Sequence, residues 1–522
     1  MKKKIKALMH LLKTPEFWII LFLLLYATAN RYPLLSHIST HTYYAGADYY
    51  IFTWILSWNC HALETLDFAH YWATNAMHPY PYALAFSENL SGLLPIAFPI
   101  WLLSHNPILT INLTLQLLLC LTAISTYLVL RKLIGNGLSA LTGTIIFVFY
   151  PYTLLGYTIG HPHMVALMWL PLICYANWKF WHDGKWKYWF IIMFFWLWNF
   201  LISLYVGILM TIFFGLWNLI WFFYERSLFT VKKIIKCLAG VLLVWLLMIP
   251  VFLVYYNVTQ NMGAIRTLEH QLHYTGYVWS WFTTQQDNWL WGQKLNILPP
   301  SRILSREDAM FPGIIAICLF LISYFIKNIP CWLKSMRWSA VILALCAIGP
   351  STIGIPYNIP LPYTVLWYLF PPLHAIRNPH RLSIFALLGA SFIATFILQK
   401  FTPLSKKYLV IKITVLTILC LELFTYSVPQ EAMHPGVAGI YKQLAKENNQ
   451  LTIIELPMPR NWMGWMSETK PLINSTYHWN TIINGLSGLW PPIQFQAGRE
   501  FKDFPSPHTI SFLQSLGVDT VL

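Results

Sequence analysis

Charged side chains are scarce in this chain. Only 10% of its 522 residues are charged, while 57% are hydrophobic. Soluble globular proteins carry roughly 25% charged residues, which excludes a soluble domain as the bulk of the molecule. The mean hydropathy of +0.53 points the same way. The composition therefore predicts a protein that crosses a membrane many times.

Sequence signatures of cofactor and nucleotide sites are missing as well. The eight cysteines are scattered, without the spacing of a disulfide framework or a zinc site. No Walker loop, dinucleotide fingerprint, nucleophile elbow or zinc motif occurs. We therefore expect no nucleotide-driven reaction and no resident cofactor, and we leave a divalent metal open. The energy for any reaction would come from an activated donor in the membrane.

Long apolar runs are what the chain does have. Runs near the length of a bilayer crossing recur along most of it. The candidate spans, about eleven in all, are 17–34, 107–130, 138–152, 163–178, 187–202, 205–224, 234–256, 312–326, 338–351, 382–399 and 408–428. The sequence thus predicts a mainly α, polytopic transmembrane helical bundle.

Basic residues concentrate on one side of this topology. With the N-terminus inside and the spans alternating, the inner segments hold most lysines and arginines, and the outer segments hold most acids. This is the positive-inside pattern. The net charge of +15 is then mainly an orientation signal, and no nucleic-acid partner is expected. Chemistry that needs carboxylates would work on the outer face.

Three outer segments are too long for simple connections: 35–106, 257–311 and 429–522. We divide the chain into a transmembrane domain, 1–428, which carries the first two as loops, and a small C-terminal extracytoplasmic domain, 429–522. In the latter, a helix near 437–447, a strand in "QLTIIELP" (450–457) and a helix, glycine and strand in "HTISFLQSLGVDTVL" (508–522) form an α/β pattern. We expect this domain to be short or truncated.

The stretch "YYAGADYYIF" (43–52) sets one carboxylate, Asp48, among tyrosines beyond the first span. A carboxylate held against apolar surface has a raised pKa and can act as a base. The alternative is that Asp48 caps a helix over 49–58. We interpret the tyrosines as anchors at the membrane interface, and Tyr49 also as a sugar contact.

Glu88 and two histidines are further candidates. Glu88 precedes the apolar piece 92–104, interpreted as a re-entrant or interfacial helix. It is either a second carboxylate across from Asp48 or a polar loop residue. His161 and His163 lie just outside a predicted span. Two ligands are too few for a metal site, so they either bind a phosphate or sugar hydroxyl or are interfacial histidines satisfied by water.

Arg377 and Arg381 lie four residues apart, where the apolar run 363–381 breaks at two prolines. If helical, they share a face and can clamp a lipid phosphate. Snorkelling is the alternative, but outer arginines run against the positive-inside pattern. Glu422, inside the last predicted span, should face protein and pair with a basic group.

The second outer loop combines acids with aromatics. Glu269 and Trp289 lie in or beside "RTLEHQLHYTGYVWSWFTTQQDNWLWG", and Glu307 follows them. Such a segment suits either a carbohydrate-binding face or a helix lying in the membrane interface. We keep both interpretations, with Glu269, Trp289 and Glu307 as candidate acceptor or sugar contacts.

Seven pieces of the sequence, in order, resemble the GT-C class of membrane glycosyltransferases, and more closely a family of bacterial multi-spanning proteins of that type. The pieces are "GADYYIFTWILSW", "RKLIGNGLSALTGTIIFVFYPYTLLGYTIGHPHMVALMWLPL", "RTLEH", "AMFPGIIAICLFL", "AIRNPHRLSIFALLGASF", "ELPMPR" and "STYHWNTIINGLSGLWPP". The resemblance implies transfer of a sugar from a polyprenyl-phosphate carrier to a glycan, lipid or protein acceptor outside a bacterial inner membrane.

The resemblance also implies roles for single residues. Asp48 matches the first-loop acid of the class, which takes a proton from the acceptor or steers it. Arg377 and Arg381 would hold the donor phosphate. The class often carries a second acid, sometimes with a metal, for which Glu88, Glu269 and Glu307 are candidates.

Two other functions remain open from the sequence. A transporter or flippase for a lipid-linked glycan would need polar groups at mid-membrane depth and usually shows internal repeats, but no convincing repeat is found and acids cluster in the loops. A non-catalytic envelope assembly factor would use the C-terminal segment as a binding module.

Overall fold

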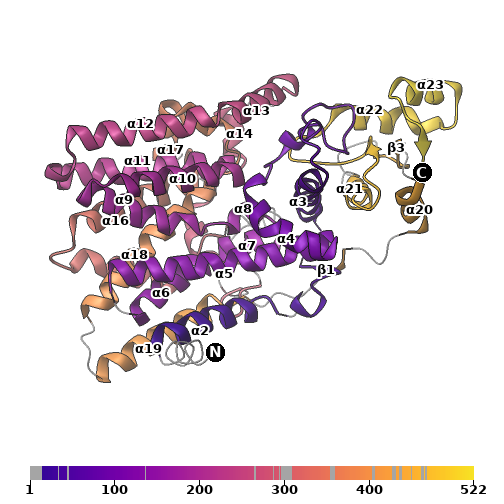
Figure 1. Ribbon diagram of the computed structural model, residues 1–522. Helices are drawn as coiled ribbons and strands as arrows, with labels where there is room; N and C mark the ends of the chain where they lie inside the picture. Colours follow the sequence, from indigo (N-terminus) through magenta and orange to yellow (C-terminus); the bar gives the residue numbers. More distant parts are fainter. Residues whose placement is uncertain are drawn as a thin grey trace, which may run out of the picture.

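The computed structural model describes most of the chain between residues 14 and 522. The residues in that interval outside the description are 33, 44–45, 136, 264–265, 286, 293, 295–308, 353–358, 402–405, 426–430, 434–437, 448–449, 460–463 and 465–466. The fold is mainly helical. A large helical bundle occupies one side of the molecule, and helices α20 to α23 lie at the other, with α3 between them (Figure 1).

Several helices are long and apolar enough to cross a membrane. In the described part of the chain these are α5 (Pro107–Leu133), α11 (Leu204–Tyr224), α16 (Cys331–Ile348) and the stretch Pro379–Lys400, which joins η10 (Pro379–Leu382) to most of α18 (Ser383–Phe401). Two bent pairs raise the number from four to six. They are α6 (Gly137–Val148) with α7 (Pro151–Thr158), and α12 (Val231–Leu247) with α13 (Ile249–Asn261). The predicted total of about eleven stays a prediction.

Proline accounts for the bends. Pro151 and Pro250 each lie in the first turn of the second helix of a bent pair, where a missing N–H costs nothing. The shorter apolar helices α2 (Pro15–Ala29) and α10 (Trp186–Ile202) also lie on predicted spans. The remaining helices of four or more residues before the C-terminal segment are α4 (Leu94–Ser104), α8 (Pro162–Val165), α9 (Trp169–Asp183), α14 (Leu268–Leu272), α15 (Ile314–Ile322), α17 (Pro362–Leu369) and α19 (Lys406–Glu422), with η1 (Leu34–His37), η2 (Ala83–Phe86), η5 (Val278–Phe282) and η9 (Pro371–Ala375).

Helix α18 lies at the centre of the bundle, against α6 and α16. Glycine permits both contacts. A Cβ on Gly143 of α6 would lie 2.6 Å from the backbone oxygen of Ser391, and one on Gly389 of α18 would lie 3.0 Å from Ala340 Cβ. Small residues of this kind let membrane helices approach closely.

Helix α3 (Ala47–Thr65) is the main element of the first long loop. It packs on α4, α5 and α21 and is buried over most of its length. Tyr43, Tyr49 and Tyr50 are 2%, 0% and 6% exposed. The interpretation of these tyrosines as interface anchors was therefore wrong, because protein surrounds their rings. Tyr44 lies outside the described residues.

The C-terminal segment contains a small parallel sheet in the order β4-β3-β5. Its elements are α20 (Gly439–Glu447), β3 (Thr452–Ile454), α21 (Thr469–Ser475), β4 (Thr481–Ile482), α22 (Pro492–Glu500), α23 (Pro507–Ser515) and β5 (Thr520–Val521). The predicted helix, glycine and strand at the end are confirmed, with Gly517 at φ +68°. The predicted division into two domains stays a prediction.

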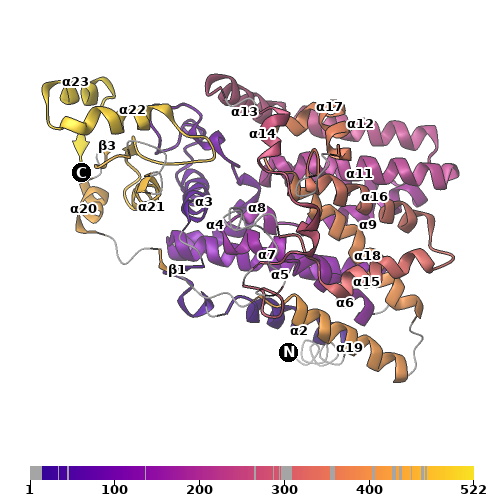
Figure 2. The ribbon, with the colours of Figure 1, turned by 180° about the vertical axis from the view of Figure 1, so that it is seen from behind.

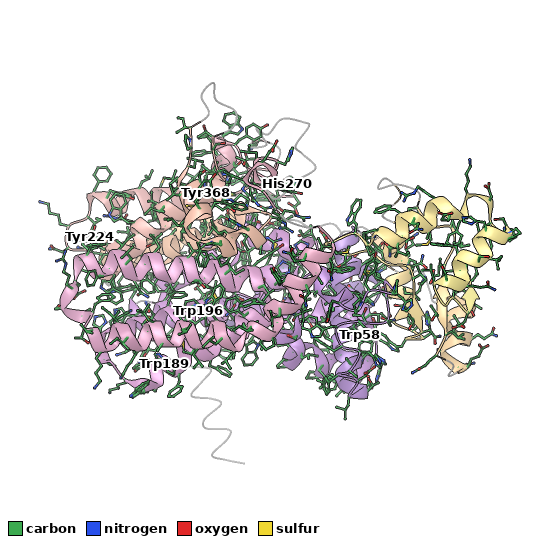
Figure 3. The ribbon with its side chains drawn as sticks, turned by 90° about the horizontal axis from the view of Figure 1, so that it is seen from above. Trp58, Trp189, Trp196, Tyr224, His270 and Tyr368 are labelled. Atoms are coloured by element: carbon green, nitrogen blue, oxygen red, sulfur yellow. The ribbon has the colours of Figure 1, made fainter. Side chains whose placement is uncertain are left out.

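Several contacts join this segment to the first long loop, among them a strand pairing and a stack of two rings. Strand β1 (His41–Thr42) pairs antiparallel with β2 (Glu431–Ala432). The ring of Trp479 stacks on His61 of α3, with centroids 4.0 Å apart. Trp58 of α3 lies on the side of the molecule next to the C-terminal segment, whereas Trp189 and Trp196 lie in the large bundle (Figure 3).

Candidate active site

Asp48 lies in the first turn of α3, where the helix dipole favours a carboxylate. The N-cap of the helix is Gly46, so the capping interpretation of Asp48 was wrong. The Oδ2 atom of Asp48 lies 3.2 Å from Nε2 of His161. This is an ion-pair distance, although the two groups are not aligned for a hydrogen bond. The Asp48 side chain is 55% exposed, whereas His161 is buried, so an acceptor can reach the carboxylate.

A glycine brings His161 to this carboxylate. Gly160 follows α7 and has φ +74°, and a Cβ there would lie 2.6 Å from the ring of Tyr49. Only glycine allows the chain to pass so close to α3 at this conformation. The Tyr49 hydroxyl donates a hydrogen bond to Asn112 Oδ1. Tyr49 is fully buried, which leaves it no surface for the predicted sugar contact.

His163, in α8, lies behind His161. The two ring centroids are 5.1 Å apart, and Phe52 of α3 lies 4.9 Å from one and 5.1 Å from the other. His163 is 2% exposed, and neither ring nitrogen has a hydrogen-bond partner in the described part of the chain. Burial holds the pKa of His163 well below its usual value, with help from the charges of His161 and Arg381. His163 is therefore a neutral support for His161. Helices α3, α7 and α8 lie together in both ribbon views (Figure 2).

The charge state of Asp48 differs from the expectation. Burial would raise the pKa of Asp48, but the contact with His161 and the charges of Arg377 and Arg381 together hold that pKa below its usual value. The predicted raised pKa was therefore wrong. Asp48 is a carboxylate at neutral pH, poised opposite positive charge.

The two predicted arginines reach this side of the molecule by separate routes. Arg381 lies in η10, buried, with its guanidinium 4.6 Å from the ring centroid of Tyr205. Arg377 precedes η10, is exposed and lies 5.4 Å from the ring of Tyr274. They do not share a helical face, because Asn378 caps a new turn that begins at Pro379. Both nevertheless act on the pKa of Asp48.

A third arginine was missed. Nη1 of Arg266 donates to the hydroxyl of Tyr205 at 3.3 Å and to the carbonyl of Ala375 at 2.9 Å. Tyr205 thus contacts Arg266 with its hydroxyl and Arg381 with its ring. We call Arg266, Arg377 and Arg381 the arginine cluster. The sequence did contain a signal for Arg266. It is the first residue of "RTLEH" and lies in a predicted outer segment, where positive charge is rare.

Arg266 and Arg377 bring positive charge to the cluster. Within the described ranges, neither Arg266 nor Arg377 forms an ion pair with a carboxylate. The positive charges of Arg377 and Arg381 both lower the pKa of Asp48. Guanidinium groups match phosphate oxygens in geometry as well as charge. The arrangement can therefore hold an anion beside an ionised carboxylate.

Glu88 holds the turn of the chain that carries Tyr205, which contacts the arginine cluster. Its carboxylate accepts hydrogen bonds from Ser203 Oγ at 2.7 Å, from Leu204 N at 2.8 Å and from Tyr205 N at 3.2 Å. It thus binds the N-terminus of α11, a natural anion site. Burial raises the pKa of Glu88, and these hydrogen bonds partly offset the rise. The geometry supports a positioning role, because Glu88 holds the turn that carries Tyr205.

The other predicted candidates lie elsewhere. Glu269 is exposed in the first turn of α14, and Trp289 is 58% exposed. Glu307 lies outside the described residues. Glu422 accepts hydrogen bonds from the backbone N–H groups of Ile314 and Ile315, so the predicted basic partner was wrong. No group of three or more His, Cys, Asp or Glu side chains that could hold a metal occurs among the residues that the structure describes.

Comparison with known proteins bears on the fold. No protein-family model and no curated protein matches the sequence. Among solved structures, the chain is similar to the arabinofuranosyltransferase AftD from Mycobacteria, with a TM-score of 0.57 and 12% sequence identity. The predicted resemblance is confirmed at the level of the fold. The match covers 96% of this chain but only 34% of AftD, so the chain spans about a third of that protein's length.

Proposed function

We propose that this protein is a membrane glycosyltransferase that moves a sugar from a polyprenyl-phosphate carrier to an acceptor hydroxyl. The observation that carries the proposal is the juxtaposition of ionised, accessible Asp48 with the arginine cluster. A base and a phosphate site are the two functions that such a transfer requires. The fold shared with AftD supports the same reaction class.

The reaction follows from these two groups. The acceptor oxygen forms a bond to the anomeric carbon of the sugar while the bond from that carbon to the phosphate oxygen breaks. Asp48 takes the acceptor proton. The arginine cluster receives the negative charge that develops on the leaving polyprenyl phosphate. A single displacement of this kind inverts the anomeric configuration.

Donor binding would also activate the base. The charges of Arg377 and Arg381 help to depress the pKa of Asp48 in the free protein, which makes it a weak base. A bound phosphate offsets those charges, so the pKa of Asp48 rises towards its ordinary value. The carboxylate then becomes a better proton acceptor only when the donor is in place.

The positive-inside pattern supports a topology for this reaction. We propose a bacterial inner-membrane protein with the N-terminus in the cytoplasm, and with Asp48 and the C-terminal segment outside. The acceptor is then an extracytoplasmic glycan, lipid or protein. Exposed Glu269 and Trp289 of the second loop are proposed sugar contacts, since aromatic rings pack well on the apolar faces of sugars.

The decisive experiment compares Asp48→Asn with Asp67→Asn. Asp67 lies in the same long loop, is partly exposed and pairs with exposed His70, so it controls for loss of a loop carboxylate. Each variant is expressed in a deletion strain, its membrane level is checked, and lipids and glycans are analysed by mass spectrometry. We expect the wild type and Asp67→Asn to restore one missing sugar and Asp48→Asn to fail.

Two outcomes would contradict the proposal. Full sugar transfer by Asp48→Asn at a normal membrane level would remove Asp48 as the base. Movement of a labelled lipid-linked glycan across vesicles without any new glycosidic product would favour a transporter instead.

A further inference from the structure

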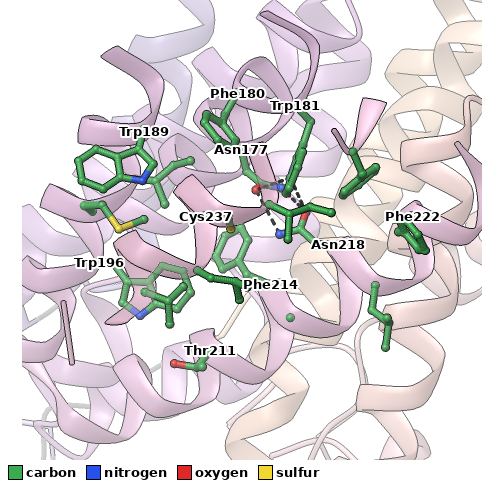
Figure 4. Close-up of a pocket in the computed structure, with 18 residues that line it drawn as sticks. Asn177, Phe180, Trp181, Trp189, Trp196, Thr211, Phe214, Asn218, Phe222 and Cys237 are labelled. Atoms are coloured by element: carbon green, nitrogen blue, oxygen red, sulfur yellow. Dashed lines mark hydrogen bonds between the residues drawn. The ribbon is translucent and has the colours of Figure 1, made fainter. Parts of the chain in front are cut away.

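A cavity that is open on one side lies between α9, α10, α11 and α12 (Figure 4). Its volume is about 440 Å³, within the range of small-molecule pockets. On α11 the lining begins at Thr211 and ends at Phe222. With a rise of 1.5 Å per residue, the cavity extends from roughly 9 to 26 Å beyond Tyr205 along that helix. It therefore lies towards the end of the bundle opposite Asp48.

The wall of this cavity contains few polar side chains, and those few form hydrogen bonds within the protein. Asn177 donates to Asn218 Oδ1 at 2.9 Å, Asn218 donates to Asn177 Oδ1 at 3.3 Å, and Trp181 Nε1 donates to Asn218 Oδ1 at 3.0 Å. Thr211 bonds to the carbonyl of Gly207 at 3.1 Å. The asparagines thus satisfy one another, and most of the remaining lining is aromatic or aliphatic. Such a wall suits a hydrocarbon chain.

One position on the wall faces open space. A Cβ added to Gly215 of α11 would meet no atom within 4 Å. Gly215 lines the same cavity as Trp189, Trp196 and Cys237, which Figure 4 labels. The open space at Gly215 is therefore part of the cavity, and a side chain introduced there would extend into it.

The end of the cavity remote from Asp48 is basic. Lys233 Nζ donates to the carbonyl of Trp181 at 2.5 Å, which ties this lysine to a lining residue. Lys236 Nζ lies 3.9 Å from the ring centroid of Trp186, and its carbonyl accepts from Trp189, another lining residue. Lys232 beside them is exposed. Basic groups at one end of a gap between membrane helices are the signature of an anionic lipid headgroup site.

We propose that this cavity binds a membrane phospholipid with an anionic headgroup. One acyl chain fills the space around Gly215, and the phosphate lies against Lys232, Lys233 and Lys236. The three lysines at this end favour a phospholipid as the occupant. The alternative occupant, the carrier chain of a sugar donor, would have its phosphate at the arginine cluster at the opposite end. The site is separate from the proposed reaction and does not depend on it.

The test uses the full-length protein, delipidated in detergent and exposed to phosphatidylglycerol, phosphatidylcholine or undecaprenyl phosphate. Native mass spectrometry counts the lipid retained by the wild type, Gly215→Leu and Ala239→Leu. Ala239 is an exposed residue of α12 outside the cavity, so its variant adds similar bulk elsewhere. We expect the wild type and Ala239→Leu to retain phosphatidylglycerol about tenfold better than phosphatidylcholine, and Gly215→Leu to lose this retention.

A headgroup variant tests the other half of the site. The double variant Lys232→Gln, Lys236→Gln should still hold lipid but lose the preference for phosphatidylglycerol over phosphatidylcholine. Should Gly215→Leu fail to fold, Cys237→Leu fills the same space from α12. Equal retention by the cavity-filling and Ala239→Leu variants would overturn the proposal. So would preferential retention of undecaprenyl phosphate that the lysine changes do not affect.

Discussion

Removal of the Tyr205 side chain should weaken phosphate binding at the arginine cluster. The hydroxyl holds Arg266 through a 3.3 Å hydrogen bond, and the ring faces Arg381 at 4.6 Å. A hydrogen bond of this length is worth about 1 kcal/mol, and a partly buried cation–π contact about 1 kcal/mol more. Tyr205→Phe should therefore raise the dissociation constant by at most about fivefold, and Tyr205→Leu by at most about thirtyfold.

Undecaprenyl phosphate, the carrier without its sugar, serves as the probe, and intrinsic fluorescence of the protein in detergent reports its binding. Tyr256→Phe and Tyr256→Leu are the controls, because Tyr256 is 60% exposed on α13. Arg266→Gln should cost more than Tyr205→Phe, because it removes a charge of the cluster as well as the hydrogen bond, and the two changes together should cost less than their sum, since they share that hydrogen bond. Wild-type affinity in Tyr205→Leu would refute the idea that this ring organises the cluster.

Three further predictions concern titratable groups. Arg377→Gln removes a charge that depresses the pKa of Asp48, so the acid limb of the kcat/KM profile should move to higher pH, whereas Arg499→Gln, at an exposed position of α22, should leave it unchanged. Glu88→Gln should lower the free energy of unfolding by about 1–3 kcal/mol, because an amide cannot accept all three hydrogen bonds at the α11 N-terminus; an unchanged stability with activity abolished would make Glu88 a catalyst instead. Burial raises the pKa of Glu468 from 4.5 to about 7, so the stabilisation from its protonated form is complete below the ordinary pKa and is lost as the pH rises through about 7. Glu468→Gln should then protect β3 and β4 from hydrogen exchange at pH 8 by up to about 3 kcal/mol relative to wild type, and an identical pH dependence in both proteins would contradict this.

Much of the fold was predictable because bilayer thickness sets a length that apolar runs must meet. The described apolar helices α2, α5, α10, α11 and α16 all lie on predicted runs. The C-terminal α/β pattern was readable for a different reason. The period of its apolar residues and Gly517 after α23 are local signals, which need no knowledge of the neighbouring chain.

The site was predictable only as a set of residues on one face. Alternation of the predicted spans placed Asp48, His161 and Arg377 on the same side of the membrane, and the structure brings Asp48 and His161 into contact. The contact between Arg266 and Tyr205 could not be foreseen, because it joins the second loop to the start of α11. The predicted direction of the Asp48 pKa shift was wrong for the same reason, since the shift depends on charges from distant segments.

The acidic side chains Glu88, Glu422 and Asp48 differ in the groups that stabilise their carboxylates. Glu88 was predicted as a site residue and Glu422 as the partner of a basic group, yet each accepts backbone hydrogen bonds at the N-terminus of a helix distant in sequence, α11 and α15 respectively. A helix N-terminus stabilises a buried carboxylate without any neighbouring cation. Asp48 differs from both, because it is accessible and faces a histidine and arginine charge. Hydrogen bonds hold Glu88 and Glu422 in buried positions that a substrate cannot reach, whereas the Asp48 carboxylate is exposed, and this accessibility is the physical reason to assign the proton transfer to it.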